Sequence, residues 1–383
     1  MSMPHLWIRA EQRANEDRVG ITPDGAKALI GQGFDLTIEE SESRILPLDG
    51  YVEAGCAVAP EGSWPEAPED AIIFGLKELP EDGTPLVHRH IMFGHAYKGQ
   101  PAGQVLLERF AAGGGTLYDL EYLLDEDGRR VAAFGYWAGY AGAAVALMCW
   151  AAQKRHDICG PVHPYADAEA LRADLNIQLL ATGSERPDAL VIGALGRVGR
   201  GAADLCKAMR VPVTAWDMEE TASGGPFPEV LMHEIFLNCI LAGPDTPVFV
   251  PSSAGSDPRA LRVIGDIACD PDSDFSPIKV YDRTTTWSAP ALRVHYTPAL
   301  DVTAIDNLPS MLPRESSEDF AGQLLPSLKT LDDLDSGVWG RAKEIFDAHV
   351  ARYQDFTAPR TGAARDTVPG KDARTETTKR STP

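Results

Sequence analysis

Two apolar segments of the sequence each end in a side chain that can carry a proton. Residues 71–77 end at Lys77, and residues 90–95 end at His95. Both segments are predicted to be buried strands, and open α/β sheets bind their ligands beyond the carboxyl ends of the strands. A lysine beside apolar walls and other cations has a lowered pKa, which suits a general acid or base, and a histidine can transfer a second proton. The alternative interpretation is a strand-end lysine that reaches solvent and a structural histidine.

Charged residues surround these two strand ends in the sequence. Arginines and glutamates alternate in one polar loop at Arg9, Glu11, Glu16 and Arg18, and a second group is Arg129–Arg130. Arginine binds carboxylates through two parallel N–H groups. Because the net charge is −21, an anionic substrate would need such a cationic pocket. The two groups favour a substrate with several carboxylates, and surface ion pairing is the alternative.

Two acids directly follow or lie beside the predicted strand ends, namely Glu78 and Glu121. Either carboxylate could orient Lys77 or His95 and adjust its proton affinity, or it could bind an ammonium group of a substrate. The alternative is that both glutamates are simply solvated.

A glycine-rich turn suggests a nucleotide site. Residues 189–201 contain four apolar residues followed by G-A-L-G-R-V-G-R-G, which predicts a strand, a tight turn and the start of a helix. Such a turn brings backbone N–H groups and the positive end of a helix to a pyrophosphate. The spacing is G-x-x-G-x-x-G rather than G-x-G-x-x-G, so a turn that binds nothing is the alternative. The next predicted strand ends at Asp217, which would accept hydrogen bonds from ribose hydroxyls and repel a 2′-phosphate, so we expect NAD rather than NADP.

Composition excludes several classes of protein. The acidic charge argues against nucleic acid and anionic membranes as partners. The sequence has no apolar run of the length of a membrane-spanning helix and no secretory signal pattern. Its six cysteines are scattered, and no metal-binding or catalytic-metal motif occurs. We therefore expect a cytoplasmic protein with reduced thiols and without a catalytic metal.

The elements that must position these residues alternate between strands and helices. This order predicts an α/β protein with two Rossmann-like, doubly wound domains and an active-site cleft between them. We expect a substrate domain at 1–133 completed by 315–356, an NAD-binding domain at 134–314, and a disordered tail at 357–383. Helices are predicted after the Thr22–Pro23 cap, at 51–57, 102–113 and 134–150, and within 313–350. Further strands are predicted at 34–39, 116–122, 234–241, 247–251 and 261–268.

These residues are embedded in motifs by which the chain, from about residue 6 to 350, resembles the NAD-dependent, L-lysine-forming saccharopine dehydrogenases. That family is related to alanine dehydrogenase and to the transhydrogenase domain. The motifs are R-A-E…E-D-R-V-G-I-T-P at 9–23, I-I-F-G-L-K-E-L-P at 72–80, P-L-V-H-R-H-I-M-F-G-H-A-Y-K at 85–98, T-L-Y-D-L-E-Y-L at 116–123, D-G-R-R-V-A-A-F-G-Y-W-A-G-Y-A-G-A at 127–143, I-G-A-L-G-R-V-G at 192–199, G-G-P-F at 224–227, D-N-L-P-S-M-L-P-R-E-S-S at 306–317 and L-L-P-S-L at 324–328.

The resemblance implies a reaction in which saccharopine, NAD and water give L-lysine, 2-oxoglutarate and NADH. Lys77 would be the base for amine oxidation and would contact the substrate, and His95 would serve the proton transfers of imine hydrolysis. The resemblance also implies roles for further residues: Arg18 and Arg130 on substrate carboxylates, Phe134 in the substrate cleft, Glu78 and Glu121 as acids that support the proton carriers, and Gly193, Leu195, Gly196, Arg197, Val198, Gly199, Asp217 and Asp306 on the cofactor.

Two features depart from the family pattern. The segment after Asp217 lacks the arginine that the family carries near Ser223, so NAD affinity is expected to be weaker, and residues 241–265 match poorly. Two alternatives remain. One is an alanine dehydrogenase-type enzyme that acts on a small 2-oxo acid and ammonia, and the other is a non-catalytic NAD-binding protein. The arginines at 129–130 favour the larger, tricarboxylate substrate.

Overall fold

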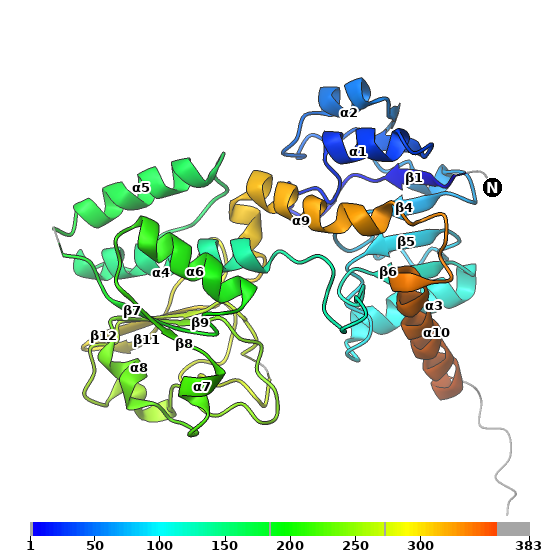
Figure 1. Ribbon diagram of the computed structural model, residues 1–383. Coiled ribbons are helices and arrows are strands. Elements are labelled where there is room, and N and C mark those ends of the chain that lie inside the picture. Colours follow the sequence, from blue (N-terminus) through cyan, green and yellow to red (C-terminus); the bar gives the residue numbers. More distant parts are fainter. Residues whose placement is uncertain (1–2, 184, 272, 358–383) are drawn as a thin grey trace, which may run out of the picture.

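Two parallel-rich sheets form two bodies that lie side by side (Figure 1). The computed structural model describes residues 3–183, 185–271 and 273–357, with the side chains of 354–357 left out. The first sheet has the order β3-β2-β1-β4-β5-β6, and all its strand pairs are parallel. Its strands are β1 (His5–Ile8), β2 (Asp35–Glu39), β3 (Ala57–Ala59), β4 (Ile72–Phe74), β5 (Arg89–Met92) and β6 (Thr116–Asp119).

Helices from both ends of the chain cover the first sheet. These are α1 (Pro23–Ile30), α2 (Leu48–Ala54), α3 (Pro101–Gly113), α9 (Pro313–Leu328) and α10 (Gly337–Thr357), with a 3-10 helix η1 (Trp64–Glu66). Helix α1 begins as predicted, because the Thr22 hydroxyl accepts the Gly25 N–H and Pro23 occupies the first turn. Helix α10 packs against β6 and α3, so the end of the described chain completes the first body.

The second sheet has the order β11-β12-β10-β9-β7-β8, in which only the β11–β12 pair is antiparallel. Figure 1 shows α4, α5 and α6 on one face of this sheet and α7 and α8 on the other. The strands are β7 (Ala189–Ile192), β8 (Val213–Trp216), β9 (Ile235–Asn238), β10 (Val263–Asp266), β11 (Leu292–Tyr296) and β12 (Ala299–Thr303). The helices are α4 (Gly135–Lys154), α5 (Ala168–Leu180), α6 (Arg197–Ala208), α7 (Met218–Thr221) and α8 (Pro228–Met232), with 3-10 helices η2 (Ser252–Gly255) and η3 (Leu308–Met311).

Small residues let α4 and α6 pack backbone against backbone. A Cβ atom at Gly139 of α4 would lie 1.8 Å from the carbonyl oxygen of Val198, and one at Gly201 of α6 would lie 1.9 Å from the carbonyl oxygen of Tyr136. This contact fixes α4, which is almost entirely buried, against the helix that follows the glycine-rich turn. The start of α4 and the start of α6 therefore lie beside each other.

The α/β prediction with parallel, doubly wound sheets is confirmed, while several local predictions are wrong. Residues 247–251 form no strand and contribute only an isolated bridge from Val250 to Ile278, and β3, β11 and β12 were not predicted. The helix predicted at 51–57 ends at Ala54. The tail predicted at 357–383 lies outside the described residues apart from Thr357, which is the last residue of α10.

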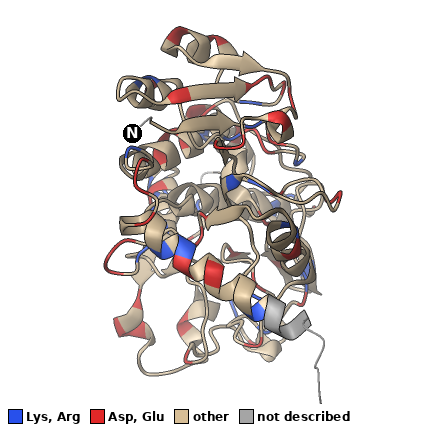
Figure 2. Ribbon diagram, turned by 90° about the vertical axis from the view of Figure 1, so that its right-hand side faces the viewer, with Lys and Arg blue, Asp and Glu red and all other residues tan. Residues whose placement is uncertain are grey.

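Figure 2 shows that lysine, arginine, aspartate and glutamate lie mostly on the helices and loops, while the strands carry few of them. Within the described residues, no helix combines the length and the apolar character that crossing a bilayer requires. The order of each sheet reverses direction at one point, between β1 and β4 in the first and between β7 and β9 in the second. Crevices at such switch points are the usual ligand sites of α/β sheets.

Candidate active site

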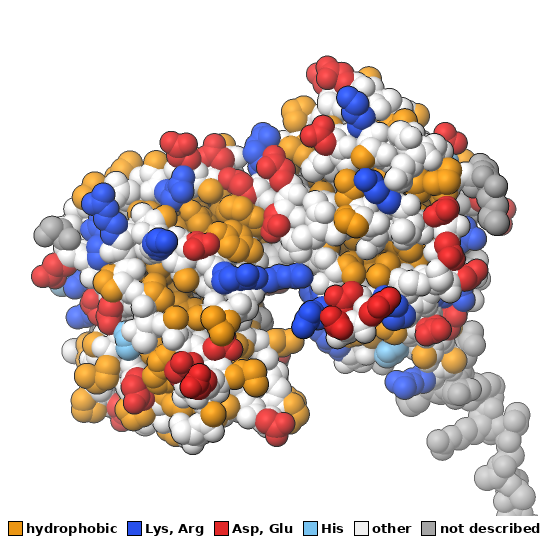
Figure 3. Space-filling view, viewed as in Figure 1, with side chains coloured by type: hydrophobic (Ala, Val, Ile, Leu, Met, Phe, Trp, Pro, Cys, Tyr) orange, Lys and Arg blue, Asp and Glu red, His pale blue; other side chains and the backbone are white. Residues whose placement is uncertain are grey.

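A cavity of about 860 Å³ lies between the two bodies, beyond the carboxyl ends of both sheets. Figure 3 shows the hollow between the bodies, with basic side chains beside it. Most of the predicted substrate-site residues line this cavity together with three predicted cofactor residues. They are Arg18, Lys77, His95, Glu121, Arg130, Phe134, Arg197, Val198 and Asp306. Residues that are up to 288 positions apart in the chain (306 minus 18) thus share one cleft.

Lys77 follows the end of β4 by three residues, on the loop at the switch point of the first sheet. Burial lowers the pKa of its amine below the ordinary lysine value, and the positive charges of Arg18 and Arg13 lower it further. The carboxylates of Glu16 and Asp306 act in the opposite direction. Lys77 is therefore more easily deprotonated than a solvated lysine, as a general base requires.

His95 follows β5 by three residues and adopts a left-handed backbone conformation with φ of 49°. Its half-exposed ring places Nδ1 3.7 Å from Oε2 of Glu121. The same carboxylate accepts the Lys98 ammonium at 2.9 Å and Nη2 of Arg130 at 3.3 Å. His95, Lys98 and Arg130 lower the pKa of Glu121 to about 2. Glu121 is thus a stable anion that collects three basic groups at the rim of the cleft.

Asp119, the last residue of β6, holds the backbone of Glu121 in place. Its Oδ1 accepts the backbone N–H of Glu121 at 2.9 Å, and its side chain is buried. Burial is the largest reason that the pKa of Asp119 is raised to about 6. Asp119 and Lys98 were not predicted as site residues, although Lys98 ends the motif at 85–98 and Asp119 lies within the motif at 116–123.

Arg18 is held in place before any ligand arrives. Its Nε and Nη2 each lie 2.6 Å from the buried carboxylate of Glu16, and Nη2 also donates to Oδ1 of Asn307 at 2.6 Å. The guanidinium lies 4.1 Å above the ring centre of Phe134, which stacks on Phe320 at 4.2 Å. Burial alone would raise the pKa of Glu16, but the charge and hydrogen bonds of Arg18 lower it below its usual value. The bonds to described residues use Nε and Nη2, so Nη1 remains for a ligand.

Arg13, which was not predicted, connects two of the predicted acids. Its Nη2 donates to Oδ2 of Asp306 at 2.9 Å, and its Nη1 lies 3.5 Å from Oε1 of Glu78. Desolvation would raise the pKa of Asp306, but the bond from Arg13 and the charge of Lys77 lower it. Glu78 lines a second cavity of about 660 Å³, which adjoins the first at Lys77, His95 and Asp306.

The two predicted arginines at 129–130 separate in the structure. Arg130 lines the cleft, whereas the exposed Arg129 pairs with Asp127 at 3.3 Å. Within the described residues, no group of three or more histidine, cysteine, aspartate or glutamate side chains is arranged to hold a metal ion.

The glycine-rich turn has the geometry of a phosphate-binding loop. Gly193 has φ of 87°, and a Cβ atom at Gly199 would lie 2.1 Å from the carbonyl oxygen of Gly193. Gly196 is the N-cap of α6 and provides no side-chain cap, so the first N–H groups of the helix remain available to an anion. The turn therefore requires glycine at 193 and at 199, whereas Gly196 has an ordinary extended backbone.

Asp217 is tied to this turn. Its Oδ2 accepts the N–H of Leu195 at 2.9 Å, and its Oδ1 accepts the N–H of Met218 at 3.0 Å. A third cavity, of about 420 Å³, opens beside it between the segments that follow β8 and β9. Large apolar side chains lie exposed around this region, namely Leu195 at 77%, Met218 at 82% and Leu241 at 73%. Apart from Leu195 they were not predicted, since no pattern distinguishes an exposed apolar ligand contact from a core residue.

The fold defines the class of protein. It is similar to the solved structure of an L-alanine dehydrogenase, with a TM-score of 0.64 at 15% identity over 92% of this chain and 100% of that chain. It is also similar to a transhydrogenase from Sinorhizobium meliloti, with a TM-score of 0.59 at 18% identity over 86% of this chain and 95% of that chain. Residues 7–141 match the family model "Alanine dehydrogenase/PNT, N-terminal domain". The chain thus has the two-sheet fold of these dehydrogenases.

Sequence comparison defines the family within this class. The chain is 45% identical to the saccharopine dehydrogenase [NAD(+), L-lysine-forming] of Candida glabrata, over 91% of this chain and 97% of that protein. It is 43% identical to the enzyme of the same name from Schizosaccharomyces pombe, over 92% of this chain and 100% of that protein. The chain belongs to the family of NAD(+)-dependent, L-lysine-forming saccharopine dehydrogenases, and the predicted resemblance is confirmed.

Proposed function

We propose that this protein oxidises saccharopine with NAD⁺ and water to L-lysine, 2-oxoglutarate and NADH. The observation that carries the proposal is the cleft itself, in which Lys77, the His95–Glu121 pair and two arginines face the glycine-rich turn of the second sheet. The relatives that cover nearly the whole chain are named for this reaction.

The residues of the second body fit NAD⁺. The close approach of Gly199 to Gly193 and the uncapped start of α6 leave room and N–H donors for a pyrophosphate. Asp217 would accept hydrogen bonds from the adenosine ribose, and the third cavity beside Met218 would hold the adenine. When bound, NAD⁺ supplies the acceptor for the hydride. Arg197, Val198 and Asp306 would line the path from the turn toward Lys77.

The first body would bind the substrate through its charges. The glutarate part of saccharopine carries two carboxylates, for which Nη1 of Arg18 and the guanidinium of Arg130 are the proposed partners. Phe134 would form an apolar wall, since its ring is fixed between Arg18 and Phe320. These contacts would orient the carbon that loses the hydride toward the second body.

Lys77 and His95 would then divide the proton transfers. Neutral Lys77 takes the proton of the secondary amine, while the adjacent glutarate carbon loses a hydride and an imine forms on the substrate. His95, oriented by Glu121, would take a proton from the attacking water and return it to the departing nitrogen. The hydroxyl proton of the adduct then also passes to the nitrogen, so cleavage of the C–N bond gives the lysine amine and the 2-oxoglutarate carbonyl. The proton that Lys77 took from the secondary amine is released to solvent, which balances the reaction as one H⁺ formed with NADH.

An NADH absorbance assay tests this proposal. We expect turnover with saccharopine and NAD⁺, much less with NADP⁺, and none with alanine, which is the substrate of the alternative enzyme type. The variants Lys77→Met and His95→Gln should each lower kcat by about 10²-fold or more while the protein stays folded. Absence of saccharopine turnover by the unmodified protein would refute the proposed function, and unchanged rates in both variants would refute the residue roles.

We further propose that the first body, including α9 and α10, is the substrate domain, and that residues 134–314 are the NAD-binding domain. The two switch points, one in each sheet, support this division because they face the same cleft. We also propose that the enzyme acts in the cytoplasm on small molecules alone. Its net charge of −21 supports this, because nucleic acids and anionic membranes would repel it.

A further inference from the structure

The peptide groups on both sides of Lys77 are held by one buried ion pair. Oε1 of Glu11 accepts the N–H of Leu76 at 2.6 Å, and Oε2 accepts the N–H of Lys77 at 3.0 Å. The guanidinium of Arg9 donates to the carbonyl oxygen of Lys77. Nη1 of Arg9 lies 3.4 Å from Oε2 of Glu11, which closes the arrangement. The two side chains thus hold both the N–H and the C=O of the candidate base.

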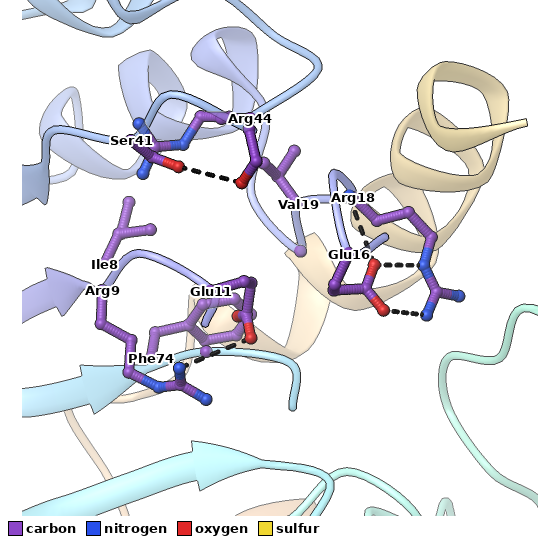
Figure 4. A pocket seen from close by; sticks show the side chains of 12 residues that line it. Ile8, Arg9, Glu11, Glu16, Arg18, Val19, Ser41, Arg44 and Phe74 are labelled. Atoms are coloured by element: carbon purple, nitrogen blue, oxygen red, sulfur yellow. Dashed lines mark hydrogen bonds and ion pairs between the residues drawn. The ribbon is translucent and has the colours of Figure 1, made fainter. Parts of the chain in front are cut away.

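The Arg9–Glu11 pair supplies hydrogen bonds to the backbone at the point where the ladder between β1 and β4 ends. The last ladder contact joins the N–H of Arg9 to the carbonyl oxygen of Phe74, after which β1 and β4 separate. A Cβ atom at Gly75 would lie 2.3 Å from Nε of Arg9, so only glycine lets the guanidinium cross the chain there. Figure 4 shows Arg9 and Glu11 paired beside Phe74, apart from the Glu16–Arg18 pair.

Burial of the Arg9 and Glu11 side chains costs free energy, because both charges lose their hydration. The side chains of Arg9 and Glu11 are only 1% and 9% exposed. A buried ion pair loses hydration that its mutual attraction recovers only in part, so an apolar pair would hold the fold as well. Neither side chain lines the substrate cleft among the described residues. Their contacts are directed instead at the backbone of Lys77.

We propose that Arg9 and Glu11 are positioning residues, which fix the backbone of Lys77 so that its amine stays inside the cleft. The proposal rests on the proposed function, since it assigns these residues to the same reaction. The charged groups that face the amine are Arg13, Glu16 and Arg18 from the loop after β1, and Asp306 from the segment before η3. A shift of the Lys77 backbone would move the amine away from this environment and toward water.

Loss of the Arg9–Glu11 pair is therefore expected to raise the pKa of Lys77. Burial and the charge of Arg18 lower the pKa of Lys77, so an amine that moves outward regains a higher pKa. At neutral pH a smaller fraction of the enzyme then holds the neutral base. In Glu11→Gln the side chain keeps one acceptor oxygen, and its NH₂ group faces a backbone N–H. One of the two hydrogen bonds to the N–H groups of Leu76 and Lys77 is therefore lost. Arg9→Met removes the donor to the Lys77 carbonyl and leaves Glu11 in place.

Two measurements on the full chain test the proposal. The first is the pH profile of kcat/KM for saccharopine, where we expect kcat/KM at neutral pH to fall about tenfold or more and the acidic limb, which follows deprotonation of Lys77, to move up by about one pH unit in both variants. The second needs no turnover. Trinitrobenzenesulfonate labels neutral amines, and mass spectrometry of the Lys77 peptide across pH gives the labelling midpoint, which should rise by a similar amount.

A matched control separates positioning from stability. Asp301 is also buried and also pairs with an arginine, Arg293, but it lies in the second sheet, far from Lys77 in the topology. Asp301→Asn should lower the thermal midpoint and leave the Lys77 labelling midpoint unchanged. If Glu11→Gln and Arg9→Met behave like Asp301→Asn, the proposal is overturned and the pair is structural. Should Glu11→Gln fail to fold, Arg9→Met decides the question alone.

The two readouts also separate this proposal from the proposed function. If the unmodified protein does not turn over saccharopine, the proposed function fails, while the labelling midpoints still report whether Arg9 and Glu11 position Lys77. If saccharopine is turned over and the midpoints do not move, only the positioning role fails.

Discussion

Replacing Asp119 by asparagine should remove a pH-dependent loss of stability from the first body. The side chain is 1% exposed, and burial raises its pKa from the usual 3.8 to about 6. A shift of about 2 units corresponds to roughly 3 kcal/mol between the two protonation states. Between pH 4 and 6 the folded protein binds more protons at this site than the unfolded chain does, so stability falls as the pH rises through this window. Asparagine does not ionise, and it keeps an oxygen for the Glu121 N–H.

Urea unfolding of both proteins at a series of pH values from 4 to 8 measures this effect. The stability of Asp119→Asn relative to the unmodified protein should improve by roughly 3 kcal/mol from the acid end of the window to pH 7. Any cost of replacing the second carboxylate oxygen changes the free energy of unfolding by a constant amount. This cost is the same at every pH, so it leaves the change in relative stability between the acid end of the window and pH 7 unaffected. The exposed Asp127 provides the control, because its pair with Arg129 lies at the surface and Asp127→Asn should change stability only slightly. A pH-independent difference between Asp119→Asn and the unmodified protein would refute the reasoning.

Three further predictions follow from single contacts. Asp217→Ala removes the acceptor of the glycine-rich turn and of the proposed ribose bonds, so the Kd of NAD⁺ measured by calorimetry should rise about tenfold; an unchanged Kd would contradict the role. Gly139→Ala places a methyl group 1.8 Å from a carbonyl oxygen and should cost about 3 kcal/mol in urea unfolding, whereas Gly160→Ala, which meets nothing within 4 Å, should be nearly neutral. Phe134→Leu removes the ring beneath Arg18 and should raise the KM of saccharopine about tenfold while the KM of NAD⁺ stays constant; equal changes in both would indicate a general loss of the fold.

The sequence predicts those parts of the fold and site that depend on local pattern. The apolar runs before Lys77 and His95 indicate strands, and parallel strands bring their carboxyl ends to one edge, so the two residues could be placed together in advance. The glycines at 193 and 199 likewise specify a turn that a larger residue could not form, because Gly193 has φ of 87° and a Cβ atom at Gly199 would lie 2.1 Å from the carbonyl oxygen of Gly193. The strands themselves are shorter than predicted, because β4 and β5 end three residues before Lys77 and His95.

Contacts between distant segments could not be predicted in this way. Arg13 reaches Asp306 across 293 positions, and nothing in either local sequence identifies the partner. Glu121 has a well-defined role only because Lys98 and Arg130 converge on it from different loops. The segment 247–251 has the apolar composition of a strand but finds only one bridging partner, since pairing depends on neighbours that composition does not reveal.

The contacts that join the two bodies at the cleft are polar, and this bears on how the site works. Arg13 reaches Asp306, Arg18 reaches Asn307, and Nη2 of Arg197 donates to the carbonyl oxygen of Arg130 at 3.4 Å. The Arg13–Asp306 and Arg197–Arg130 contacts are exposed, so they contribute little to stability and water or an anionic ligand can replace them, whereas the Arg18–Asn307 bond is partly buried. Each is made by an arginine in or beside the proposed binding region of the substrate or of NAD⁺. We therefore expect anionic ligands to compete for the groups that join the bodies, so that binding and the spacing of the two bodies are coupled. Because Arg9 and Glu11 make their contacts within the first body alone, the backbone of Lys77 would keep its place throughout that exchange.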